Sequence, residues 1–122
     1  MKVCVFSTQK YDELALKQWA DPAIHWTFLS QKLDLVSVHG ATGADAICVF
    51  VNDQLNAPVL HALKELGIRF IALRCAGYNN VDLTTAKQLG FTLVRVPAYS
   101  PQAVAEHSVG LMLCLPLLRQ FV

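Results

Sequence analysis

Short apolar, β-branched runs alternate with helical segments along the chain, and this alternation constrains its fold more than any other feature. The run Ala46–Val51 is continuously apolar, as in a strand that is covered on both faces. Gly67 and Gly90 each follow a helical pattern and precede the next apolar run, which is typical of a helix end. Strands separated by helices pair in parallel through right-handed crossovers, so the sequence predicts an α/β fold.

The expected architecture is a flavodoxin-like three-layer α/β/α sandwich with a mostly parallel five-stranded sheet. The expected strands are Lys2–Ser7, His25–Leu29, Ala46–Val51, Phe70–Leu73 and Thr92–Val96. The expected helices are Tyr11–Ala20, Ala57–Leu66, Leu83–Leu89 and a last one from Pro101 to about Leu115.

The ends of the predicted strands locate the candidate site. In parallel α/β sheets, ligands bind beyond the carboxyl ends of the strands. In this chain those ends are Ser7-Thr8, Asn52-Asp53, Arg74 to Asn80, and Pro97 to Ser100.

The composition indicates a folded, water-soluble domain without a strongly charged partner. Apolar residues make up 54% of the chain and charged residues 16%, which excludes a disordered chain. The net charge of +1 provides no basic field for nucleic acid. The longest apolar stretch, Val109 to Leu118, is interrupted by Gly110 and Pro116 and is shorter than the roughly 18 residues of a membrane span. We expect a cytoplasmic protein with no nucleic-acid or membrane partner.

Neither the cysteines nor the histidines have the spacing of metal ligands. A zinc site needs ligand pairs a few residues apart. We expect the cysteines to be buried and reduced, because a free buried cysteine behaves as a small apolar side chain. We also expect His25 to begin a strand, His39 to lie in a linker and His61 to lie on a helix exterior, with no metal site. The four cysteines, spread over the whole length, are Cys4, Cys48, Cys75 and Cys114.

The segment from Arg74 to Asp82 has the highest density of residues suited to binding. Gly77 and two asparagines tolerate positive φ and leave backbone N–H groups free to converge on an anion. Arg74 supplies a cation suited to a carboxylate, and Asp82 is placed to cap the helix that begins at Leu83. The alternative is a tight strand-to-helix turn with a solvent-facing arginine. Composition alone leaves the two interpretations equally open.

A second polar segment surrounds Tyr99. Ser100 and Pro101 form a helix start, so Tyr99 lies just before a helix at the ligand edge of the sheet. Glu106 and His107 are adjacent on that helix and do not face each other as an acid–base pair would. The residues alone favour a structural role for this segment.

The chain has no recognisable nucleotide fingerprint, because it lacks GxGxxG and no Lys-Ser/Thr follows Gly40 to Gly43. A phosphoacceptor receiver domain is an alternative of similar length, with Asp53 near the end of the third strand. Against it, the first strand is followed by Ser7 and Thr8 and not by an acidic pair for Mg²⁺. The fifth strand also ends in Arg95-Val-Pro and not in Lys-Pro.

Four longer motifs occur in order between Met1 and about Leu115: MKVCVFSTQKYD, GADAICVFVNDQL, FIALRCAGYNNVD and VRVPAYSPQAVAEHSVGLML. In these motifs the chain closely resembles the D-isomer-specific 2-hydroxyacid dehydrogenases, in particular their D-lactate dehydrogenase branch. The resemblance favours a binding role for the loop that begins at Arg74.

The resemblance implies a two-domain, NAD-dependent enzyme with its active site between a flavodoxin-like substrate domain and an inserted Rossmann domain. For this chain it implies a substrate domain over residues 1–100 and the start of a hinge helix, with an atypical truncated tail, over 101–122. The resemblance implies that the Rossmann domain is not included in these 122 residues. The catalytic Arg, Glu and His of the family and its GxGxxG loop lie beyond residue 122. No catalytic residue is therefore expected here, and tight NAD binding by this chain is not expected.

The resemblance also implies contacts to a small 2-oxo or 2-hydroxy acid. Backbone amides at Ala76 and Gly77 hold the carboxylate, Phe50 lies near the substrate side chain, and Tyr99 faces substrate and nicotinamide. The implied substrate-binding residues are Phe50, Arg74, Ala76, Gly77 and Tyr99, and the implied nicotinamide contact is Val104.

The expected function is that of the substrate-side portion of an NAD-dependent D-lactate dehydrogenase, which in its full-length family converts pyruvate and NADH to D-lactate and NAD. This chain alone is expected to be inactive. The alternative is a non-catalytic folded remnant or an interaction module. The family completes its substrate domain with a C-terminal segment that this chain lacks, so we expect self-association through uncovered apolar surface.

Overall fold

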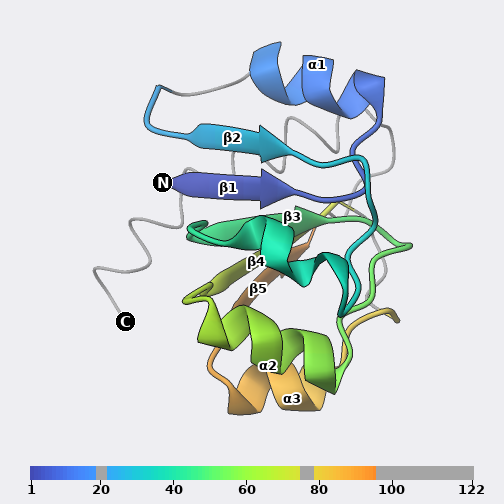
Figure 1. Ribbon diagram of the computed structural model, residues 1–122, viewed down its shortest axis with the longest axis vertical. Coiled ribbons are helices and arrows are strands. Elements are labelled where there is room, and N and C mark those ends of the chain that lie inside the picture. The colour runs from blue at the N-terminus through green and yellow to red at the C-terminus, as the bar shows by residue number, and fades with distance from the viewer. Residues whose placement is uncertain (19–21, 75–78, 96–122) are drawn as a thin grey trace.

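The computed structural model describes residues 1–18, 22–74 and 79–95, and its centre is a five-stranded sheet with the strand order β2-β1-β3-β4-β5 (Figure 1). All of its strand pairings are parallel. The strands are β1 (Lys2–Val5), β2 (His25–Phe28), β3 (Ala46–Val49), β4 (Phe70–Leu73) and β5 (Thr92–Arg95). The helices are α1 (Lys10–Gln18), the 3-10 helix η1 (Ser37–Ala41), α2 (Ala57–Glu65) and α3 (Leu83–Gln88).

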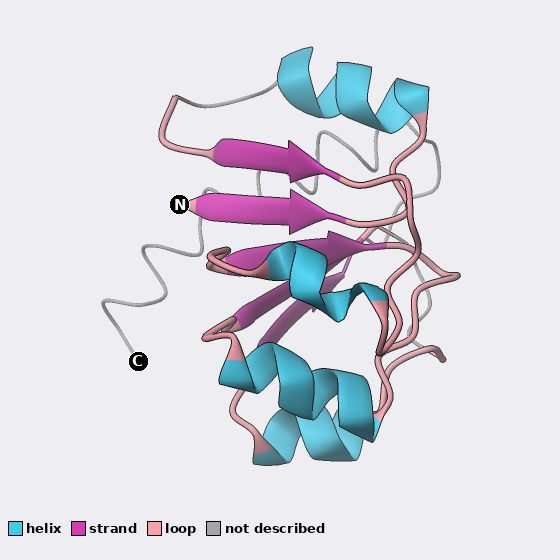
Figure 2. Ribbon diagram, viewed as in Figure 1, coloured by secondary structure: helices cyan, strands magenta, loops and turns pink. Residues whose placement is uncertain are grey.

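Helices cover both faces of this sheet, which gives the predicted three layers (Figures 1 and 2). Successive residues of a strand point to opposite faces. Ile47 of β3 packs in the same apolar cluster as Leu63 of α2, whereas Cys48 packs in a second cluster with Leu16 of α1. All four side chains are fully buried, and burial of each leucine or isoleucine contributes about 2 kcal/mol. The predicted α/β fold with a parallel five-stranded sheet is confirmed.

The caps and ends of the helices lie where the sequence pattern predicts them. Asn56 caps α2 by accepting a hydrogen bond from the Val59 N–H at 3.2 Å, and Pro58 lies in the first turn. Gly67 follows α2 with a left-handed φ of 86°, a conformation that glycine adopts without strain. Asp82 caps α3 as predicted, through the Thr85 N–H at 3.1 Å.

β1 and β3 each end two residues earlier than the sequence predicts, because the chain turns away from the sheet. β3 is predicted to continue to Val51 but ends at Val49. The next residue, Phe50, donates its N–H to the Asp53 carboxylate at 2.6 Å, so this N–H is lost to the sheet. β1 ends at Val5 because Ser7 has a left-handed backbone with a φ of 53°, which a strand does not accommodate.

The expectation that His39 lies in a linker is wrong, because this residue belongs to η1. The helix places Val38 and Ala41 in the apolar core, where both are buried. His61 is exposed on α2, and His25 begins β2, both as predicted. The expected helix from Pro101 to about Leu115 lies outside the described residues.

The loops that follow β1, β2 and β3 meet at the carboxyl edge of the sheet, on the side to which the strand arrows point in Figure 1. The Ser7 N–H donates to the Gln31 carbonyl at 2.8 Å, and the Thr8 N–H donates to the Leu29 carbonyl at 2.9 Å. β1 lies between β2 and β3, which is the point where the strand order reverses. Open α/β sheets bind ligands at this position.

Candidate functional site

A cavity of about 450 Å³ lies at this carboxyl edge. Its walls come from the loops after β1, β2 and β3 and from the start of α1, and most of the lining side chains are polar. The described residues that line it are Ser7, Gln9, Tyr11, Asp12, Ser30, Lys32, Phe50 and Asn52.

The buried carboxylate of Asp53 holds three of these loops together. One of its oxygens accepts hydrogen bonds from the Ser7 hydroxyl and the Leu33 N–H, both at 2.6 Å, and the other accepts from the Phe50 N–H at 2.6 Å. Asp53 is 1% exposed. A phosphoacceptor aspartate must present its carboxylate to solvent and Mg²⁺, so this inward arrangement disfavours the receiver alternative.

Ser7 is fixed at the end of β1 by contacts to all of its polar groups. Its N–H donates to the Gln31 carbonyl at 2.8 Å, its hydroxyl donates to Asp53, and its carbonyl accepts from the Arg74 Nη2 at 3.2 Å. A left-handed conformation costs an L-residue about 1–2 kcal/mol. Such conformations persist where the surroundings hold the residue in place, and they concentrate at binding sites.

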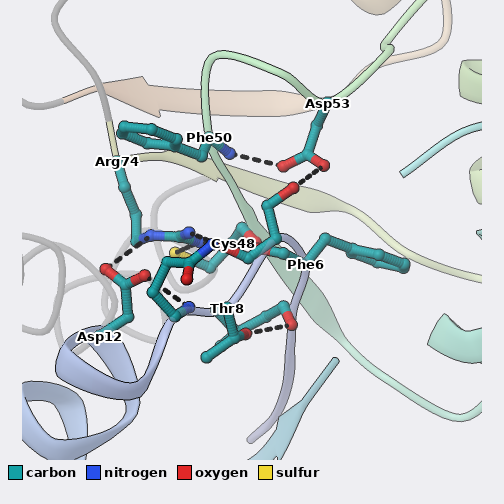
Figure 3. A network of polar contacts seen from close by, with 10 residues as sticks. Phe6, Thr8, Asp12, Cys48, Phe50, Asp53 and Arg74 are labelled. Carbon is teal, nitrogen blue, oxygen red and sulfur yellow. Dashed lines mark hydrogen bonds and ion pairs between the residues drawn. The ribbon is translucent and has the colours of Figure 1, made fainter. Parts of the chain in front are cut away.

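The guanidinium of Arg74 is buried beneath the cavity, with only 2% of the residue exposed. Nη1 donates to the carbonyls of Phe6 at 3.1 Å and Cys48 at 3.3 Å. Together with the Ser7 contact, the guanidinium joins the carboxyl ends of β1 and β3 (Figure 3). The alternative interpretation of Arg74 as a solvent-facing residue is therefore wrong.

Two side chains of the cavity wall flank this guanidinium, as Figure 3 shows. The ring centroid of Phe50 lies 5.5 Å from the Arg74 Cζ, within the range of a cation–π contact. On the other side, Asp12 Oδ1 lies 3.7 Å from Nε. Burial lowers the pKa of Arg74, but the nearby Cys48 sulfur, Asp12 and Asp53 more than offset it, so the pKa lies above its ordinary value. Arg74 is therefore a permanent buried cation.

The two described cysteines are free, buried thiols, as predicted. Burial, followed by the nearby Cys48, raises the pKa of Cys4 to about 11. Burial also raises the pKa of Cys48, although Arg74 acts in the opposite direction. Both side chains are therefore protonated near neutral pH and unsuited to nucleophilic chemistry. The expectation for Cys75 and Cys114 lies outside the described residues.

Asn80 connects the end of the binding loop to the loop after β3. Its side-chain amide donates to the carbonyls of Phe50 at 3.1 Å and Asp53 at 2.8 Å. Its own carbonyl accepts from the Leu55 N–H at 3.0 Å. Asn80 lies two residues after segment 75–78 and is thus tied to the backbone that presents Phe50.

The structure brings two of the predicted site residues, Phe50 and Arg74, into contact. Sequence reasoning missed Asp12, whose only signal was its place in the first turn of a predicted helix. The strand-end rule did point to Ser7 and Asp53, although not to the hydrogen bond between them. The other predicted contacts lie outside the described residues, namely Ala76, Gly77, Tyr99 and Val104.

The parts of the chain that the structure describes contain neither a metal-ligand cluster nor a membrane-spanning helix. Over residues 1–18, 22–74 and 79–95, no cluster of three or more His, Cys, Asp or Glu side chains is arranged to hold a metal ion. Within the same ranges, the helices are too short or too polar to cross a membrane.

The strand order, with a cavity at its reversal point, defines an α/β domain of the flavodoxin-like class. The family model for the catalytic domain of D-isomer specific 2-hydroxyacid dehydrogenases matches residues 3–109. The chain therefore belongs to the D-isomer specific 2-hydroxyacid dehydrogenase family.

Individual relatives agree with this assignment. The chain is 48% identical to the D-lactate dehydrogenase of Escherichia coli K12 over 116 residues, which cover 94% of this chain and 35% of that protein. It is also 48% identical to a 2-hydroxyacid dehydrogenase homolog of Zymomonas mobilis, with the same coverage. The chain spans about a third of the length of these curated relatives.

Solved structures of the family have the same fold. The apo-structure of the Escherichia coli D-lactate dehydrogenase superposes with a TM-score of 0.79 and 46% identity over 99% of this chain and 39% of that one. The structure of a D-2-hydroxyisocaproate dehydrogenase superposes with a TM-score of 0.75 and 34% identity over 94% of this chain and 35% of that one.

Members of the family bind NAD, and a D-lactate dehydrogenase from Lactobacillus jensenii, 28% identical to this chain, was solved with NAD⁺. The described residues do not fit the pyrophosphate of this cofactor, which needs free N–H groups in a glycine-rich turn. The N–H groups of Ser7 and Thr8 already donate to backbone carbonyls. The buried Asp53 carboxylate beside them would also repel phosphate. No hydride-transfer step can be assigned to the described residues.

Proposed function

We propose that this chain is the substrate-side portion of an NAD-dependent D-lactate dehydrogenase. The whole protein would reduce pyruvate with NADH to give D-lactate and NAD. The observation that carries this proposal is the placement of Phe50 in the wall of the carboxyl-edge cavity, in contact with the arginine that opens the binding loop. Family membership and the similarity to D-lactate dehydrogenases support the same reaction.

The proposed substrate is a small 2-oxo acid held mainly by its carboxylate. Converging backbone N–H groups stabilise an anion without adding a mobile side chain, and we assign this role to the amides of Ala76 and Gly77. Phe50 supplies an apolar wall for the substrate side chain, Arg74 supplies the positive charge of the site, and Tyr99 completes it. In support, the described ends of the loop are both anchored, Arg74 to the ends of β1 and β3 and Asn80 to the Phe50 and Asp53 carbonyls.

We also propose that this chain alone does not turn over substrate. Reduction of a 2-oxo acid requires a nicotinamide held against the carbonyl carbon and a general acid for the carbonyl oxygen. Lys32 and Tyr11 are the described cavity residues that carry an ammonium or a phenol group, and both are exposed to water. Neither is enclosed as a general acid needs to be.

The test is a titration of the 122-residue protein with pyruvate, followed by the backbone amide signals in ¹H–¹⁵N NMR spectra. We expect pyruvate to shift the signals of Phe50, Asn79 and Asn80, and acetone, which lacks the carboxylate, to shift them far less. Shifts confined to His25 and Thr42 would contradict the proposal, because these residues line a second cavity of about 390 Å³ at the amino ends of the strands.

A parallel assay follows NADH oxidation with pyruvate. We expect no turnover above background for the isolated chain. Turnover that survives repurification would contradict the assignment of the cofactor and acid–base functions to another part of the protein. Absence of any pyruvate binding would favour a folded remnant or an interaction module.

We also propose that the protein resides in the cytoplasm and self-associates at high concentration. The free thiols of Cys4 and Cys48 support a reducing compartment. A clean monomer in light scattering at high concentration would contradict self-association. Its support is the exposure of large apolar side chains, namely Tyr11, Leu14, Leu35, Val36, Val51 and Leu83.

A further inference from the structure

Arg74 lies behind the wall of the cavity and not in it. It is absent from the lining, yet its guanidinium contacts three residues that do line the cavity. These contacts are the hydrogen bond to the Ser7 carbonyl, the cation–π contact with the Phe50 ring, and the approach of Nε to Asp12. The side chain is thus placed to set the shape of the cavity without touching its contents.

The hydrogen-bonding groups of Arg74 are directed at the protein itself. Nη1 and Nη2 donate to the carbonyls of Phe6, Cys48 and Ser7, which lie at the ends of two adjacent strands. A planar guanidinium presents its donors in a rigid fork and can bridge such carbonyls simultaneously. Among the described residues Nε has no hydrogen-bond partner, and Asp12 Oδ1 lies 3.7 Å from it. Arg74 is only 2% exposed and does not line the cavity, so a substrate carboxylate in the cavity would reach this cation only if the wall moved.

A buried cation with an internal counter-charge is costly to disturb, because removal of either partner leaves an uncompensated charge. Asp12 is itself anchored, since its second oxygen accepts from the Gln9 N–H at 2.9 Å at the start of α1. The chain of contacts thus runs from α1 through Asp12 and Arg74 to the Phe50 ring, as Figure 3 shows.

We propose that Arg74 is a positioning residue of the substrate site, which orients Phe50 and Ser7 in the cavity wall under the control of Asp12 and does not bind the substrate carboxylate. This inference rests on the proposed function. It assigns Arg74 an indirect role in the site in place of a direct contact with the substrate. It predicts that Arg74 governs the fit of any ligand of the right shape, whether or not that ligand carries a negative charge.

The experiment compares pyruvate with its neutral amide, pyruvamide, as ligands of the full 122-residue chain. Arg74→Lys keeps the positive charge but loses the planar guanidinium with its several N–H donors. It should lower the affinity for both ligands by a similar factor of about tenfold, which corresponds to one lost hydrogen bond to a charged group. The affinity ratio of the two ligands should not change. A direct carboxylate contact would instead weaken pyruvate selectively and shift this ratio, which would overturn the proposal.

The matched control is Arg69→Lys. Arg69 is exposed and precedes the same strand, β4, at its opposite end, so this change should alter neither affinity. Asp12→Asn provides a milder variant in case Arg74→Lys does not fold, because the asparagine oxygen can still accept from Gln9. It should weaken binding of the neutral pyruvamide by less than Arg74→Lys does, whereas loss of the Asp12 charge from the cavity wall also favours the anion pyruvate. Selective loss of pyruvate in Asp12→Asn would also contradict the proposal.

A measurement without ligand separates this inference from the proposed function. In the unmodified chain we expect nuclear Overhauser contacts between the Arg74 Hε and the Phe50 ring. The ring signals of Phe50 should shift in Arg74→Lys and Asp12→Asn but not in Arg69→Lys. If neither ligand binds the unmodified chain, the proposed function fails for this chain, and the ring signals still decide the positioning role. Unchanged ring signals in both variants would refute it.

Discussion

Ser7 donates its hydroxyl hydrogen to the buried carboxylate of Asp53 at 2.6 Å. The carbonyl oxygen of the same serine accepts from Arg74, so one residue contacts both of the charged side chains that are buried in the described part of the chain. Ser7 makes these contacts from a left-handed backbone with a φ of 53°. The hydrogen bonds therefore offset a conformational cost of about 1–2 kcal/mol.

Two substitutions of Ser7 separate the stabilisation by its hydroxyl group from the destabilisation by its left-handed backbone. Ser7→Ala loses the hydrogen bond to Asp53 and retains the left-handed strain. Ser7→Gly loses the same bond but relieves the strain, so it should be as stable as Ser7→Ala or up to about 1 kcal/mol more stable. Urea denaturation gives both free energies of unfolding.

The control for this comparison is Ser30, which is exposed and has no positive φ. At that position glycine should be less stable than alanine by about 0.5–1 kcal/mol, the usual order. The same order at Ser7 would show that the left-handed backbone carries no strain.

Removal of the Asp53 carboxylate should be the most destabilising of the changes considered. Asp53→Ala leaves the buried N–H groups of Leu33 and Phe50 without acceptors. We expect a loss of about 3 kcal/mol in the free energy of unfolding. Asp53→Asn keeps one acceptor oxygen and should lose less of the free energy of unfolding.

The control is Glu65→Gln at an exposed position on α2, which should remain within about 0.5 kcal/mol of the unmodified protein. An Asp53→Ala protein as stable as this control would rule out the bridging role.

The acid dependence of stability should come partly from Asp34 and Asp82. The Ser37 N–H lowers the pKa of Asp34, and the Thr85 N–H lowers the pKa of Asp82. A carboxyl group with a lower pKa in the folded state stabilises the protein above its unfolded pKa of about 3.9 and loses this contribution as the pH falls through the folded value. Urea midpoints should therefore decrease below about pH 4.

Asp82→Asn tests this assignment because the amide oxygen can still cap α3 but no longer titrates. Its urea midpoint should decrease less than that of the unmodified protein between about pH 5 and about pH 3. Equal decreases in the two proteins would place the acid dependence elsewhere.

The thiols of Cys4 and Cys48 should be protected from alkylation in the folded protein. Burial raises the pKa of both side chains, to about 11 for Cys4, and the thiolate is the reactive form. With iodoacetamide at about pH 8, near the pKa of an ordinary thiol, peptides containing Cys4 or Cys48 should remain unmodified until urea unfolds the protein. Mass spectrometry assigns each site, and rapid labelling of Cys48 in the native protein would show that β3 opens locally.

The elements of the fold were predictable because their signals are local. The apolar run at Ala46–Val51, the glycine after α2 and the Asp82 cap each depend on neighbouring residues only, and each lies in the predicted element. η1 was not predictable in this way. Its five residues contain Gly40 and no helical periodicity, and they form a helical turn because Val38 and Ala41 are buried in the core.

The candidate site was less predictable, because the orientation of its charged side chains depends on distant backbone. The sequence shows that Arg74 follows a strand but not whether it points to solvent or inward. That choice depends on carbonyl groups at Phe6 and Ser7, which precede it by 68 and 67 residues. The left-handed conformation of Ser7 likewise had no sequence signal, since no glycine or asparagine marks it.

These long sequence separations also bear on how the protein folds. Contacts of high sequence separation require closure of long loops and slow the folding of parallel sheets. The cavity wall exists only after β1, β3 and β4 have paired, so its formation should coincide with the late stages of folding. A ligand bound in the cavity would then slow the unfolding of the whole sheet. Binding should therefore also slow hydrogen exchange at the most protected amides of the strands, far from the binding loop.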